Sequence, residues 1–142
     1  MESPLLGLVL DSSAVISAER NRQAVPEFVE ELLRAHRPLE ISFSPITVAE
    51  LVHGIHRAGR PEIAQRRRRY IEELLALIPV HPVTKQTAWL VGQIEGQEPA
   101  KGNVIPFNDL MIGAAALEQD YAVLTHNTRH FARIPRPRIC SL

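Results

Sequence analysis

The chain has 142 residues, and its 16 basic and 16 acidic side chains cancel to a net charge of zero. This length fits one compact domain over residues 1–142, and the single cysteine, Cys140, excludes a disulfide framework and a structural zinc site. The balanced charge removes the support that a strongly basic domain would lend to nucleic-acid binding, so any such binding must use a local patch.

A short apolar run over residues 5–10 begins the chain and ends at an acid. It is too short for a signal peptide core or a membrane span, so we expect a soluble, cytoplasmic protein. Residues 6–10 predict a buried strand, and the serine pair 12–13 can cap a helix that runs through Ser17. Asp11 therefore lies directly after the first predicted strand.

Helical spacing marks the next segment. Pro26 fits a first helical position, and apolar residues recur at helical spacing from Phe28 to His36, until Pro38 ends the pattern. Residues 41–43 then predict a second strand.

A longer helical region follows the second predicted strand. Ser44 and Pro45 form a helix-start signature, and the apolar stripe behind them ends near Gly59. Pro61 starts a new helix at once. Residues 46–78 therefore predict an antiparallel helical hairpin.

The remaining chain alternates helices and strands. The sequence predicts a weak third strand over residues 80–83, a helix over 84–97, a polar loop over 96–102, a helix capped by Asn108, a buried strand over 121–125, a turn or short helix over 126–131 and a last strand over 138–140. Strands separated by helical segments predict an α/β fold with a mostly parallel sheet covered on both faces.

Three acidic residues, each in an apolar frame of its own, are the candidate site. Asp11 follows the first strand, where ligands bind in such sheets; its structural alternative is a helix cap. Glu50 falls in the second turn of a helix that begins at Pro45, or else completes a capping box from Thr47. Asp109 at the first position of its helix suits a metal ligand, but the helix dipole alone would also favour it there.

The chemistry of this trio depends on whether the fold brings it together. Three carboxylates in one place repel each other unless a proton or a cation lies between them. Carboxylate oxygens are hard ligands, which suit Mg2+ or Mn2+. The trio therefore indicates a metal-dependent enzyme, and the absence of a glycine-rich turn after the first strand disfavours a nucleotide cofactor.

Four segments of the sequence resemble the PIN-domain nucleases, most closely the VapC-type toxins of toxin–antitoxin pairs. They are Val9-Leu10-Asp11-Ser12-Ser13-Ala14-Val15-Ile16, Ser44-Pro45-Ile46-Thr47-Val48-Ala49-Glu50-Leu51, Asn108-Asp109-Leu110-Met111-Ile112-Gly113-Ala114-Ala115-Ala116-Leu117 and Leu124-Thr125-His126-Asn127-Thr128-Arg129-His130-Phe131. The segments occur in order over nearly the whole chain.

The resemblance implies a three-layer α/β/α sandwich in which Asp11, Glu50 and Asp109 hold one or two Mg2+ or Mn2+ ions for hydrolysis of RNA. It also implies a homodimer bound by a small antitoxin that inserts a segment into the acidic site. Ser12 and Thr125 are expected either to orient carboxylates or water, or to serve only in capping and turns.

The chain departs from the family pattern at a fourth position. Many relatives carry a fourth acid before the last strand, where this chain has Asn127, or three residues later at His130. Asn127 still offers a carbonyl ligand or a donor to water or phosphate, so it is kept as a catalytic candidate. The missing charge supports one alternative function, a catalytically weak PIN scaffold that acts by binding a protein or RNA partner.

Other candidates for substrate contact are weaker. The run of arginines from Arg66 to Arg69 could follow an RNA backbone, but a helix spreads four successive residues around its circumference, which favours a solvated face. Better candidates near the acids are Arg20, Arg22, Arg129 and Arg133. Trp89 and Phe28 are expected in the core or in a dimer contact, and less so as base-stacking platforms.

Overall fold

The computed structural model describes residues 4–141, and a four-stranded sheet lies at its centre. The strands are β1 (Gly7–Leu10), β2 (Glu40–Phe43), β3 (Tyr121–Thr125) and β4 (Ile139–Ser141). All pairings are parallel, in the order β2-β1-β3-β4. Leu10 at the end of β1 pairs with Phe43 and with Leu124, so the carboxyl ends of three strands meet at one edge.

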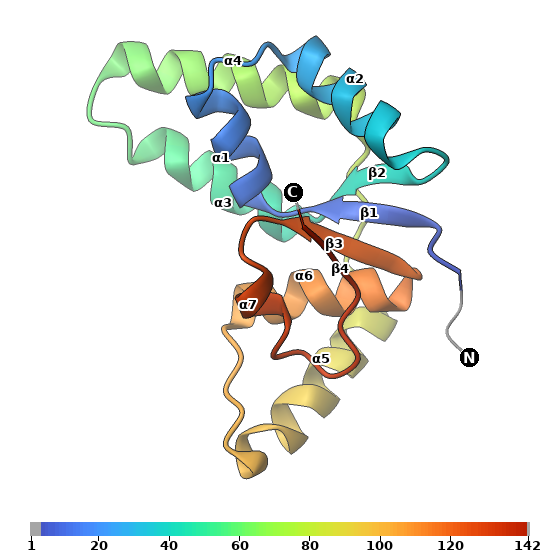
Figure 1. Ribbon diagram of the computed structural model, residues 1–142. Helices are drawn as coiled ribbons and strands as arrows, with labels where there is room; N and C mark the ends of the chain where they lie inside the picture. Colours follow the sequence, from blue (N-terminus) through green and yellow to red (C-terminus); the bar gives the residue numbers. More distant parts are fainter. Residues whose placement is uncertain (1–3, 142) are drawn as a thin grey trace.

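Helices cover both faces of this sheet (Figure 1). One face carries α1 (Ser12–Arg20), α2 (Val25–His36), α3 (Pro45–His56) and α4 (Pro61–Leu77). The other face carries α5 (Lys85–Gln97), α6 (Phe107–Glu118) and the short α7 (Thr128–Phe131), with a 3-10 turn over Pro99–Lys101. The expected three-layer α/β/α sandwich is confirmed.

Alternation along the strands explains the two layers. Leu8 and Leu10 of β1 pack with the first group of helices, whereas Val9 between them packs with the second group. Successive strand residues point to opposite faces, so a short run of apolar residues supplies both cores. The sheet is therefore buried on both sides.

Two predicted details of secondary structure are wrong. Residues 80–83 form no strand; Val80 makes only an isolated bridge to Phe43, because Pro82 cannot donate to a strand ladder. Asn108 is not a cap, because α6 begins at Phe107, two residues earlier than predicted, with Pro106 at the N-cap position. Asp109 is consequently the third residue of α6 and not the first.

The predicted helix starts at Pro26, Pro45 and Pro61 are confirmed within one residue. Phe28 is buried in the core as expected, but Trp89 on α5 is 69% exposed and takes no part in it. No helix among residues 4–141 has the length and apolar character needed to cross a membrane.

Candidate active site

Asp11 lies at the carboxyl end of β1 and is 5% exposed. It is the N-cap residue of α1, but its side chain makes no capping hydrogen bond. Instead Oδ2 accepts hydrogen bonds from the hydroxyl groups of Ser13 and Thr125, both at 2.9 Å. The carboxylate therefore does not cap the helix. The predicted cap from Ser12 or Ser13 is wrong, because α1 begins at Ser12 and Asp11 occupies the N-cap position.

The two hydroxyls belong to a small network. They lie 3.2 Å from each other, and Thr125 also accepts from the backbone N–H of Asn127 at 2.8 Å. The Ser13 hydroxyl accepts from the backbone N–H of His126 at 3.1 Å. Contact between Thr125 and Asp11 agrees with the sequence expectation, whereas Ser13 was missed, although it lies only two residues beyond Asp11.

Glu50 lies in the second turn of α3, where the sequence placed it. Ser44 caps this helix by accepting from the N–H of Ile46, and the Thr47 hydroxyl donates to the carbonyl oxygen of Leu10 at 3.0 Å. Thr47 thus attaches α3 to the end of β1 and forms no capping box with Glu50. The side chain of Glu50 is left free for another role.

The Glu50 carboxylate lies in an unfavourable environment. Its Oε1 is buried and has no hydrogen-bond partner among the described residues. Burial raises the pKa of Glu50, the negative charge of Asp11 raises it further, and hydrogen bonding from Asn108 opposes the rise. A hydrogen bond from the Ser12 hydroxyl also lowers the pKa of Glu50.

Asp109 approaches the same edge from the first turn of α6. Burial raises the pKa of Asp109, nearby His130 lowers it, Asp11 raises it and Arg133 lowers it. The Nδ1 atom of His130 lies 3.5 Å from Oδ2 of Asp109. Of the two residues considered for the fourth position, His130 is therefore the one in contact with the acids.

Asn127 is exposed and begins α7, and its side chain makes no capping hydrogen bond. Only its backbone N–H takes part in the network, through Thr125. The side-chain amide is free to contact a ligand, but the structure does not bring it to the carboxylates by a hydrogen bond.

The negative charge of Asp11 raises the pKa of both Glu50 and Asp109, so the three acids lie near one another, but they do not form a closed cage. Within residues 4–141, no three Asp, Glu, His or Cys side chains are already arranged to hold an ion. The donor set nevertheless fits a divalent cation, because its oxygens are hard ligands and the buried Oε1 of Glu50 lacks a partner. A cation would also relieve the mutual repulsion of the acids.

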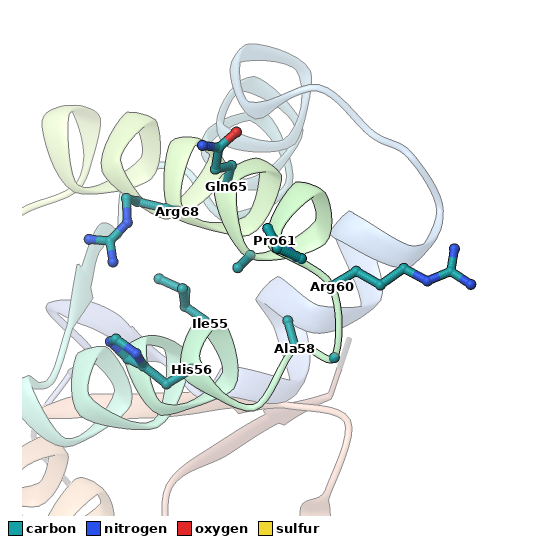
Figure 2. A pocket seen from close by; sticks show the side chains of 9 residues that line it. Ile55, His56, Ala58, Arg60, Pro61, Gln65 and Arg68 are labelled. Atoms are coloured by element: carbon teal, nitrogen blue, oxygen red, sulfur yellow. The ribbon is translucent and has the colours of Figure 1, made fainter.

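Two hollows flank the helical hairpin of α3 and α4. The larger, of about 480 Å3, lies at the turn between the helices and is lined by His56, Arg60 and Arg68 among others, with no acid (Figure 2). The other, of about 320 Å3, includes Glu50 in its wall. The larger hollow is therefore separate from the three candidate acids. Figure 2 shows the Arg60 side chain extending away from it.

The arginine candidates differ in their distance from the acids. Arg20 lines the hollow beside Glu50, and Arg133 is close enough to Asp109 to lower its pKa. Arg22 and Arg129 are exposed and form no ion pair among the described residues. Arg57 was missed, although it lies seven residues after Glu50 in the sequence, a spacing that returns to the same helix face.

The sequence and fold identify the family. The family model of the PIN domain matches residues 8–137 of the chain. The chain belongs to the PIN-domain family. Within it the chain is of the VapC type: it is 30% identical to the tRNA(fMet)-specific endonuclease VapC of Salmonella typhimurium, over 95% of the chain and 97% of that relative. It is 26% identical to the ribonuclease VapC of Rickettsia bellii, over 96% and 97% of the two chains.

Solved structures give the same result for this PIN domain. DNA-bound VapBC from Salmonella typhimurium matches with a TM-score of 0.78 and 28% identity, over 96% of this chain and 98% of that one. VapBC2 from Rickettsia felis, bound to a DNA fragment from its promoter, matches with a TM-score of 0.79 over 95% and 98%; at 21% identity it supports the fold alone.

Proposed function

We propose that this PIN domain is an endoribonuclease that hydrolyses RNA phosphodiester bonds with Mg2+ or Mn2+, as the toxin of a toxin–antitoxin pair. The observation that carries the metal site is the buried, unpartnered Oε1 of Glu50 beside Asp11. The likeness to VapC ribonucleases over nearly the whole chain supports the choice of RNA.

Asp11, Glu50 and Asp109 would hold the metal ion. When bound, such an ion lowers the pKa of a water molecule to provide the nucleophile and stabilises the charge that grows on the phosphate. Ser13 and Thr125 fix the orientation of the Asp11 carboxylate through Oδ2. No side chain is needed as a nucleophile.

We propose that the fourth position, with Asn127 and the neighbouring His130, contacts the substrate or water. Asn127 offers an amide to a phosphate oxygen or to water, and we retain it as a catalytic candidate on this ground. His130 lies beside Asp109 with an exposed ring, so it offers a second donor on the same side of the site. Neither residue adds negative charge, which favours one metal ion over two.

The proposed partners are a small antitoxin and a second copy of the chain, acting in the cytoplasm where the RNA substrate is found. The antitoxin is supported by the solved relatives, several of which are VapBC complexes. Exposed apolar side chains, including Trp89 and Phe107, supply surface that a dimer could cover.

The proposal is tested by RNA cleavage with purified protein freed of any copurified antitoxin, in the presence of Mg2+ or Mn2+. Asp11→Asn and Asp109→Asn should each lower the cleavage rate by about 100-fold or more, because each removes a charged ligand. Asp120→Asn is the matched control, since Asp120 lies before β3, away from the carboxyl edge, and Asn tolerates its positive φ.

Equal cleavage by the wild type and the two site variants would contradict the nuclease proposal. It would favour the second candidate, a catalytically weak scaffold that acts by binding. The observation that favours this candidate is the uncharged Asn127 at the fourth position.

A further inference from the structure

The hollow beside Glu50 is built from α1, α3 and α4. Its volume of about 320 Å3 falls within the range of roughly 300–1,000 Å3 typical of ligand pockets. Its lining comprises three arginines, two acids and three large apolar side chains: Arg20, Arg57 and Arg67, Glu19 and Glu50, and Ile16, Leu51 and Ile71. The hollow therefore combines positive charge with apolar surface at the border of the acidic site.

The three arginines are not equivalent. Arg67 is held in the wall: its Nη1 donates to the carbonyl oxygen of Gly54 at 2.9 Å, and its Nε lies 3.5 Å from Oε1 of Glu19. Arg20 and Arg57 are exposed and have no carboxylate partner anywhere in residues 4–141. Two guanidinium groups are thus available to an anionic ligand.

The available arginines are carried by the helices that follow and contain the acids. Arg20 ends α1, which begins directly after Asp11, and Arg57 follows the last turn of α3, which contains Glu50. Arg57 lies seven positions after Glu50, a rise of about 10 Å along the helix axis. Because the helices are rigid, the backbone positions of both arginines are fixed relative to those of the carboxylates.

We propose that this hollow is the RNA subsite next to the cleavage position, with Arg20 and Arg57 binding backbone phosphates. Ile16, Leu51 and Ile71 give the nucleotide an apolar surface to pack against. A polyanion is the occupant that these groups favour, because Arg20 and Arg57 have no carboxylate partner among residues 4–141 and phosphate contacts rely on such arginines. The inference rests on the proposed function, since it places the substrate relative to the acids.

The test separates binding from cleavage. A short, fluorescently labelled single-stranded RNA of mixed sequence is titrated with the full chain in EDTA, at several salt concentrations. Arg20→Ala and Arg57→Ala should each weaken binding by roughly tenfold and lower the salt slope by about 0.7, the value for one lost phosphate contact. Arg57→Lys should retain much of the affinity because it keeps the charge.

Arg69→Ala is the matched control. Arg69 lies on α4 with Arg67 and is exposed, but it does not line the hollow. Its removal changes the net charge by the same amount, so it should leave RNA affinity nearly unchanged. Thermal melting of each variant shows whether it is folded, and Arg67→Lys provides a third variant that keeps a charge in the wall.

The outcomes are distinct. Equal losses in Arg69→Ala and the two site variants, or no loss in any of them, would overturn the subsite, whether or not the wild type cleaves RNA. Selective losses with no cleavage by the metal-loaded wild type would support RNA binding in the hollow and overturn the proposed function. Unchanged RNA affinity with release of a copurified protein from the arginine variants would assign the hollow to a protein partner and overturn the inference.

Discussion

Asp11 is nearly fully buried, and its carboxylate contacts two hydroxyl groups and no cation among the described residues. A buried carboxylate needs hydrogen bonds or a positive partner. Ser13 and Thr125 supply the hydrogen bonds to one oxygen only, so the position is stabilised in part and remains suited to a cation. Residues that orient a ligand in this way often matter as much as the ligand itself.

Thr125→Val should therefore weaken metal binding. The change removes the donor to Asp11 and the acceptor for the Asn127 N–H while keeping the shape of the side chain. We expect Mn2+ affinity, measured by calorimetry, to fall by about tenfold. Ser42→Ala is the control: the Ser42 hydroxyl is equally buried but donates to the carbonyl oxygen of Leu8, and its loss should leave Mn2+ affinity unchanged.

Glu50→Gln should stabilise the metal-free protein at neutral pH. The pKa of Glu50 is higher in the folded protein than in the unfolded chain. The ionised carboxylate therefore destabilises the fold, with no effect below the unfolded pKa and the full effect above the folded pKa. Glutamine carries no charge, so the variant does not lose stability as pH rises. Its melting temperature should exceed that of the wild type at pH 7 and converge with it in acid.

Glu72→Gln on the exposed part of α4 controls for the general effect of one fewer negative charge. An equal rise in melting temperature for both variants would show that Glu50 has no special cost. Added Mg2+ should reduce the difference, because a bound cation favours the folded wild type.

At the level of elements, parallel strand pairing brings residues distant in sequence to one edge. Asp11 follows β1, and Thr125 ends β3, while the Thr47 hydroxyl attaches α3 to the end of β1. Close pairing of the strands depends on Gly7, where an added Cβ would lie 2.7 Å from the Tyr121 ring and 2.8 Å from the carbonyl oxygen of Glu40. The start of β1 thus admits no side chain.

Gly7→Ala should lower the free energy of unfolding by about 1–3 kcal/mol, the usual cost of overpacking a core. Gly92→Ala is the matched control, because it lies within α5 with nothing within 4 Å of its added Cβ, and alanine favours helix over glycine by up to about 1 kcal/mol. Urea unfolding of both variants checks this pair. A neutral Gly7→Ala would mean that the strands adjust without cost.

Much of this arrangement could be predicted from sequence patterns, and the features that could not be predicted have a common physical reason. The strand ending at Leu10 and the helix starting at Pro45 are local features, so Asp11 and the position of Glu50 in its helix were predicted. The Ser13–Asp11–Thr125 network and the hollow with Arg57 depend on contacts between distant elements. Local patterns do not encode such contacts.

At the level of the whole molecule, the zero net charge hides an uneven distribution. Asp11, Glu50 and Asp109 lie near one another at the carboxyl edge, while three arginines line the neighbouring hollow. The position of Trp89 was also not predictable from the local pattern. Its helical spacing suggested a core position, but the opposite face of α5 packs against α6, with Val91 and Ile94 buried. A large aromatic side chain is left on the surface.

Trp89→Glu should therefore leave the fold intact and weaken self-association. Removal of an exposed indole loses no core contact, whereas a charge in a dimer contact is costly. Sedimentation over a range of concentrations should show a dimer for the wild type and a shift toward monomer for the variant. A wild type that stays monomeric would contradict the proposed homodimer, and an unshifted dimer would place its interface elsewhere.

The most direct measurement of the central claim is a crystal structure of the protein soaked in Mn2+, with anomalous data. We predict one strong anomalous peak among the carboxylates of Asp11, Glu50 and Asp109, with Oε1 of Glu50 turned toward the ion, and no such peak in Asp109→Asn. A Mn2+-saturated crystal with no peak at these carboxylates, or with its peak elsewhere, would contradict the account.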